Sequence, residues 1–237
     1  MIINDKIKPS PLLYARVAGV LYLIIIVCGL FSEIYVRSRL IIPEDAVTTA
    51  KNIMDSIFLF RLGFISDLIM IICDVIVAII FYILLKSVNK NIALLTATFR
   101  LIQDAILGIN LLNFFVPLIL LSNSSYLKSF ETNQLYTLCL VFLTIHNYGY
   151  LIALVFFGIH CFLLGYLMIK SDYFPKLLGF GLIFASFGYL MDSCANFLLP
   201  NYTDITSWLV IISAVIAECS LCLWLLFKGI KLQINEN

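Results

Sequence analysis

The chain has 237 residues, of which 62% are hydrophobic and 12% are charged, and its formal net charge is +1. Because a soluble domain carries about 25% charged residues, this composition excludes a water-soluble globular protein. The small net charge gives no global basic or acidic field that would argue for nucleic acid or for an acidic partner, so we expect no nucleic-acid partner.

Six apolar stretches are long enough to cross a bilayer, which needs about 20 helical residues. They lie at residues 14–36, 57–85, 92–121, 135–169, 177–199 and 207–227. Lipid cannot form hydrogen bonds with the backbone, so apolar stretches of this length must be helices. The sequence therefore predicts an all-α transmembrane bundle of about six spans, which forms one integral membrane domain over residues 1–237 and is surrounded by membrane lipids.

The connection between the first two stretches, residues 37–56, is the long one. It contains Pro43-Glu44-Asp45-Ala46, a pattern that is typical of a helix start, with acidic residues near the positive end of the helix dipole. We therefore expect a short extracytoplasmic surface helix that lies across one mouth of the bundle.

The fourth apolar stretch, residues 135–169, is too long for one simple span and too short for two spans with a turn. We expect a single long helix here. Its outer part, around Leu135 to Ile145, should project into the headgroup region or bend near Gly149.

The distribution of Lys and Arg predicts the orientation, because cytoplasmic loops retain an excess of these residues. With the N-terminus inside, the inner side holds Lys6, Lys8, Arg16, Lys86, Lys90, Lys170, Lys176, Lys228 and Lys231. The outer side then holds only Arg37, Arg39, Lys51 and Lys128. We therefore predict a multi-pass protein of the cell membrane with both termini in the cytoplasm (N-in/C-in).

Ionisable and amide side chains interrupt the apolar stretches. An isolated charge at the bilayer centre costs roughly 2.5–3.5 kcal/mol on insertion scales, so we expect these groups to face the bundle interior and to form one polar seam. Arg100 and Asp104 are four residues apart on one helix face, which predicts a local ion pair. The candidates for a ligand or proton pathway are Arg61, Asp67, Asp74, Arg100, Asp104, Asn110, Asn113, His160, Asp192 and Glu218.

The acids in these stretches outnumber the arginines. Some of the acids must therefore be protonated or hydrated. Glu218 is the first candidate for a protonated acid, because no basic residue lies near it in the sequence. The same side chains also fit a structural role as hydrogen bonds between helices, and the sequence leaves both interpretations open.

The histidines do not predict a metal site. His146 and His160 are fourteen residues apart on one helix, or about 21 Å at 1.5 Å per residue, so they cannot share a metal ion. The H-E-x-x-H spacing of zinc proteases is absent, and the C-x-x-C formed by Cys219 and Cys222 lies inside a span. We therefore expect no metal and no cofactor.

Short motifs recur along the whole chain in a defined order. They include Ala15-Arg16-x-Ala18-Gly19-x-x-Tyr22-Leu23, Leu59-Phe60-Arg61, Phe99-Arg100, Gly158-x-His160 and Trp224-Leu225-Leu226-x-Lys228-Gly229. In this order and spacing, the chain resembles an uncharacterised bacterial membrane family that is known only as a domain of unknown function. The resemblance implies a multi-span helical fold over nearly the whole length and transfers no activity. Arg61, Arg100, His160 and Glu218 belong to the matching pattern.

The leading functional hypothesis is a small transporter or ligand-binding membrane protein, with a small-molecule or lipid ligand in a polar cavity inside the bundle. One alternative is an intramembrane enzyme that acts on lipid, in which His146 or His160 serves with carboxylates as acid, base or ligand. Another is a sensory or scaffolding subunit whose outer segment 37–56 meets a partner. The sequence leaves open whether the protein is an enzyme.

Overall fold

The structure is a computed structural model that describes residues 10–230. These residues form helices and no strands, which confirms the all-α fold. Six helices are long and apolar enough to cross a membrane, so the chain is a multi-pass membrane protein. The helices that form the bundle are α1 (Pro11–Leu30), α4 (Ile57–Leu85), α5 (Lys90–Leu120), α6 (Thr132–Lys170), α7 (Lys176–Leu198) and α8 (Thr203–Phe227).

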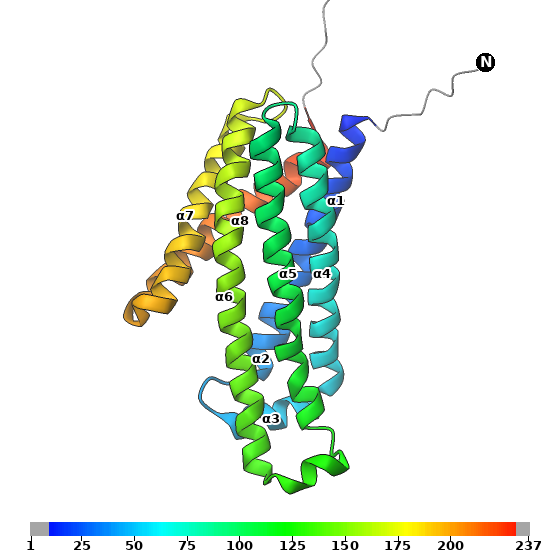
Figure 1. The fold of residues 1–237 in the computed structure, drawn as a ribbon, viewed down its shortest axis with the longest axis vertical. Helices are drawn as coiled ribbons and strands as arrows, with labels where there is room; N and C mark the ends of the chain where they lie inside the picture. Colours follow the sequence, from blue (N-terminus) through cyan, green and yellow to red (C-terminus); the bar gives the residue numbers. More distant parts are fainter. Residues whose placement is uncertain (1–9, 231–237) are drawn as a thin grey trace, which may run out of the picture.

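Helices α4, α5 and α6 stand side by side along the long axis of the bundle, while α7 leans away from α6 at one end (Figure 1). Both ends of the described chain lie at the opposite end of the bundle, as an even number of spans requires (Figure 1). We name this the inner end, because the Lys and Arg count predicts that it is cytoplasmic. That count also used Lys6, Lys8 and Lys231, which lie outside the described residues.

The first span is longer than its apolar stretch. Helix α1 continues through a π-helical segment, η1 (Phe31–Arg37), into the short helix α2 (Ser38–Leu40). Arg37, which the sequence analysis assigned to the outer connection, therefore lies on the span itself. Single π-helical turns are rare and are frequent at functional sites.

The expected surface helix is α3 (Ala46–Asp55), which crosses the outer end of the bundle and packs against α6 (Figure 1). Asp45 caps this helix, because its carboxylate accepts hydrogen bonds from the backbone N–H of Thr48 at 2.9 Å and from the Thr48 hydroxyl at 2.6 Å. These two hydrogen bonds, the hydroxyl one first, hold the pKa of Asp45 below its usual range.

Helix α6 has 39 residues and is therefore about 58 Å long, well beyond a hydrocarbon core of about 30 Å. It is one continuous helix, as expected, and its outer end lies beside α3 at the bottom of Figure 1. At Gly149 a Cβ atom would collide with the Asn110 side chain of α5. Because glycine has no side chain, Asn110 can pack directly against the backbone of α6 at this position. At the inner end, Gly165 faces Gly179 of α7, where a Cβ on Gly165 would lie 2.5 Å from the Gly179 carbonyl oxygen.

Candidate functional site

Polar side chains from five helices meet in the inner half of the bundle. Tyr22, Asp74, Arg100, His160 and Glu218 each lie nine to eleven residues from the inner end of their own helix. At 1.5 Å per residue this is about 15 Å, the middle of a hydrocarbon core of about 30 Å. We refer to these five residues, together with Asp104 and Tyr189, as the central network.

Arg100 of α5 holds Asp74 of α4 through two parallel hydrogen bonds. Its Nε donates to Asp74 Oδ2 at 3.0 Å, and its Nη2 makes a shorter contact with Asp74 Oδ1. The guanidinium carbon also lies 5.3 Å from the ring centre of Tyr22 and 5.5 Å from that of Phe157. The sequence predicted an ion pair between Arg100 and Asp104, but the structure pairs Arg100 with Asp74. The guanidinium reaches across the helix interface instead of along its own helix.

His160 completes the coordination of Arg100. The third guanidinium nitrogen, Nη1, lies 3.0 Å from His160 Nε2, and His160 Nδ1 lies 2.9 Å from the backbone oxygen of Thr96. A guanidinium only donates hydrogen bonds and a carbonyl oxygen only accepts them. His160 is therefore the neutral tautomer with its proton on Nδ1, and both ring nitrogens are occupied.

Asp104 adds a second carboxyl group to the network, and it forms no ion pair with the described residues. It lies one turn from Arg100 on α5, is 3% exposed, and neither of its oxygens receives a hydrogen bond from an N–H or O–H group of the described residues. Asp104 interacts electrostatically with Asp74 and with Arg100. Because two neighbouring buried carboxyl groups with a single guanidinium do not readily both carry their charge, this pair is a place where a proton can reside.

Glu218 of α8 and Tyr189 of α7 form another part of the central network. The hydroxyl of Tyr189 on α7 donates a hydrogen bond to Glu218 Oε1. The Tyr189 ring meets Phe157 edge-on, with ring centres 5.1 Å apart. Glu218 has no ion pair with the described residues, but it interacts electrostatically with Arg100. The central network thus links α1, α4, α5, α6, α7 and α8.

A second charged cluster lies nearer the outer end, around Arg37 of η1. Arg37 Nη1 contacts Asp67 Oδ2 of α4 at 2.6 Å and the Ser32 hydroxyl at 2.9 Å, and Arg37 Nε contacts Glu33 Oε2 at 2.7 Å. The other Asp67 oxygen, Oδ1, is buried and has no partner among the described residues. Asp67 therefore belongs to this outer cluster and not to the central network.

Asn110 and His146 link α5 to α6 beside this cluster. Asn110 Nδ2 donates to the backbone oxygen of His146 at 2.7 Å, and His146 Nδ1 lies 3.2 Å from the backbone oxygen of Asn110. Asn113 donates to the Asn110 side-chain oxygen at 3.0 Å. Since His146 Nδ1 faces a carbonyl oxygen, it carries the proton of the neutral imidazole. In that form Nε2 is an acceptor, and it is buried and unpartnered among the described residues.

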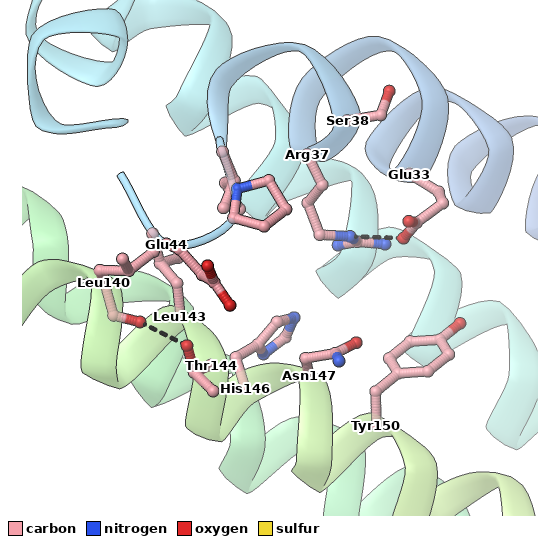
Figure 2. A pocket seen from close by; sticks show the side chains of 12 residues that line it. Glu33, Arg37, Ser38, Glu44, Leu140, Leu143, Thr144, His146, Asn147 and Tyr150 are labelled. Atoms are coloured by element: carbon pink, nitrogen blue, oxygen red, sulfur yellow. Dashed lines mark hydrogen bonds and ion pairs between the residues drawn. The ribbon is translucent and has the colours of Figure 1, made fainter. Parts of the chain in front are cut away.

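A pocket of about 460 Å³ opens at the outer end, between η1, the connection to α3 and the outer part of α6 (Figure 2). Its volume is within the range of small-molecule sites. The polar residues that line it are Glu33, Arg37, Ser38, Glu44, Thr144, His146, Asn147 and Tyr150. This outer pocket is separate from the central network.

The comparison with known proteins gives a family. Residues 17–229 match the family described as Domain of unknown function (DUF4386). The chain belongs to this family. An uncharacterized protein from Archaeoglobus fulgidus is 32% identical over 190 residues, which cover 77% of this chain and 96% of that protein. No solved structure matches.

The family assignment confirms the resemblance that the motifs indicated over nearly the whole chain. The relative is archaeal, so the bacterial source that the motifs suggested stays a prediction. Two candidate residues of the DUF4386 chain lie apart from both clusters. Asp192 accepts hydrogen bonds from the hydroxyls of Thr206 at 2.7 Å and Ser207 at 3.3 Å, which joins α7 to α8, and Arg61 lies on an exposed face of α4.

Proposed function

We propose that this protein is a small transporter of the cell membrane, which binds a polar solute and couples its movement to a proton held between Asp74 and Asp104. The observation that carries the proposal is that two interacting carboxyl groups, Asp74 and Asp104, are buried in the bundle beside one guanidinium, which forms its ion pair with Asp74. Unpaired intramembrane acids are costly, and they typically mark ion or proton routes.

A purely structural role would not require the second acid. The bidentate pair of Arg100 and Asp74 joins α4 to α5 by itself. Asp104 adds a buried carboxyl group that no N–H or O–H of the described residues satisfies, and such a group costs several kcal/mol if it is charged and unpaired. A proton shared with Asp74 removes that cost.

The arrangement also supplies a way to couple the proton to helix contacts. The charged groups that face Asp104 are Asp74 from α4 and Arg100 from its own helix. A proton that moves from Asp104 to Asp74 neutralises the partner of Arg100 and draws the guanidinium toward Asp104. Since Arg100 also contacts His160 of α6, the shift changes contacts among three helices.

Proton flux in liposomes tests this proposal. The purified protein is reconstituted into vesicles that enclose a pH-sensitive dye, and a potassium diffusion potential with valinomycin supplies the driving force. The wild type should acidify the vesicles faster than empty liposomes do, and Asp104→Asn should reduce the rate to that of empty liposomes. Asp55→Asn, which changes an exposed carboxylate on α3, is the matched control and should keep the wild-type rate. Equal flux in the wild type and Asp104→Asn, or no flux in the wild type, would contradict the proposal.

A further inference from the structure

The outer pocket is lined by a buried polar side chain that lacks a hydrogen-bond partner among the described residues. Its floor includes His146, whose side chain is 4% exposed and whose Nε2 has no hydrogen-bond partner among the described residues. Figure 2 shows the imidazole rising from α6 into the space between Glu44 on one side and Arg37 with Glu33 on the other. An imidazole that lines a pocket, and whose buried acceptor nitrogen lacks a donor, indicates a ligand that supplies the donor.

The fixed groups around the pocket favour a positive charge. Arg37 is the one cation in the lining, and its charge is already met by Asp67 behind it and by Glu33 beside it. Glu33 keeps its second oxygen, Oε1, free of hydrogen bonds to the described residues, and Glu44 has no ion pair there. The carboxylates of Glu33 and Glu44 therefore leave the pocket with an excess of negative charge.

The rest of the lining fits a short hydrocarbon chain. Leu140, Leu143, Ile41 and the ring of Tyr150 line the same space. In the described chain, residues 10–230, no three His, Cys, Asp or Glu side chains lie close enough together to hold a metal ion. The combination of hydrogen-bond acceptors, negative charge and apolar wall suits an organic cation better than a metal ion.

We propose that the outer pocket binds a small primary ammonium compound. The ammonium group donates its hydrogen bonds to Glu33, Glu44 and His146 Nε2, and its hydrocarbon part lies against Leu143 and Tyr150. The ligand is either a free amine from the outer solution or the amino headgroup of a lipid such as phosphatidylethanolamine. Binding of the amine does not depend on the proposed function, because it is measured without flux. Transport of the bound amine would rest on the proposed function.

Isothermal titration calorimetry with protein in phosphatidylglycerol nanodiscs tests this inference. The probes are butylammonium and tetramethylammonium, which carry the same charge, but only butylammonium has N–H donors. Hydrogen bonds to charged groups are stronger than those between neutral groups, so butylammonium should bind at least about tenfold more tightly than tetramethylammonium. Equal affinities for the two probes would overturn the assignment.

Variants of the lining locate the site. His146→Phe keeps a ring beside Phe114, whose centre lies 5.2 Å from that of the imidazole, but removes the acceptor. This variant and Glu44→Gln should each weaken butylammonium binding about tenfold, while Asp55→Asn should leave it unchanged. Asp104→Asn should also bind normally, so a failure of the flux proposal and a failure of this inference give different results. Unchanged affinity in both lining variants would overturn the site.

Nanodiscs that contain phosphatidylethanolamine distinguish the two sources of the amine. If the headgroup is the natural occupant, the added lipid competes and lowers the apparent affinity for butylammonium. If the ligand is a free amine, the affinity stays the same in both kinds of nanodisc. The absence of butylammonium binding in both kinds of disc would overturn the inference.

Discussion

Replacing Arg100 with leucine should destabilise the fold strongly, because it leaves Asp74 buried without its partner. Arg100 and Asp74 are 1% and 4% exposed. Removing one member of a buried ion pair typically costs about 3–5 kcal/mol, whereas replacing both members with apolar residues is often close to neutral. The double variant Asp74→Leu/Arg100→Leu should therefore be less destabilised than the sum of the two single variants. Polar contacts in membrane bundles couple only moderately, so we expect a coupling energy of about 1–3 kcal/mol.

The protein carries its own probes for this measurement. Cys139, Cys161 and Cys222 are buried, whereas Cys194 is exposed. A thiol-reactive dye should therefore label Cys194 in the folded state and the buried thiols only after unfolding. Unfolding of the wild type, both single variants and the double variant is followed with this dye along a denaturant series.

Arg61→Leu serves as the control, because Arg61 lies on an exposed face of α4. It should change the free energy of unfolding by no more than about 0.5 kcal/mol. If the double variant loses as much free energy of unfolding as the two single variants together, Arg100 and Asp74 are not coupled. The geometry of the central network would then be wrong.

Two further predictions concern the helix contacts. Gly165→Ala should lower the free energy of unfolding by about 1–3 kcal/mol, because its Cβ would meet the backbone of α7. Gly108→Ala, where a Cβ meets nothing within 4 Å, should raise it by up to about 1 kcal/mol, and the opposite order in the thiol-dye assay would contradict the packing of α6 on α7. Asp45 has a lowered pKa in the folded state, so its stabilisation of α3 is present above its unfolded pKa of about 3.9 and is lost as the pH falls through the folded value. Hydrogen-exchange protection of α3 should fall in that acid range in the wild type, and Asp45→Ala should lower it at neutral pH; equal protection in both proteins at neutral pH would exclude the cap.

The sequence was sufficient to predict the helices, because hydropathy and length alone require them in lipid. It also predicted the single long helix α6 and the surface helix α3, whose start is marked by Asp45. The ends of the spans were harder to predict from the sequence. The first span continues through the π-helical segment η1 to Leu40, beyond the predicted end at residue 36, and no hydropathy pattern distinguishes that continuation from a loop.

The sequence indicated most of the buried charged residues, although Arg61 is exposed and Arg37 was not among the candidates, but it did not indicate which of them meet. Helical spacing placed Arg100 and Asp104 on one face of the same helix, and this spacing predicted an ion pair between them. The actual partner of Arg100 is Asp74 on α4, and that choice depends on how α4 and α5 are rotated against each other. The rotation is set by packing between helices, which a single sequence does not display.

The outer pocket could not be predicted from the sequence, because its lining residues come from segments that are far apart along the chain. Arg37 had been assigned to a connection, and Glu44 lies in a connection far from α6 along the chain. Only the folded chain brings them to His146. The one signal in the sequence was the four-residue spacing of Glu33 and Arg37, which becomes an ion pair in η1.

Infrared difference spectroscopy tests the central claim, the shared proton, most directly. A protonated carboxyl group has a carbonyl stretching band that a carboxylate lacks, and the buried pair should show this band at neutral pH in the wild type. Asp104→Asn should remove the part of the band that belongs to the pair, whereas Glu218→Gln should remove only what Glu218 contributes. If the wild type shows no such band at neutral pH, or if Asp104→Asn leaves the band unchanged, then Asp74 and Asp104 do not hold a proton between them.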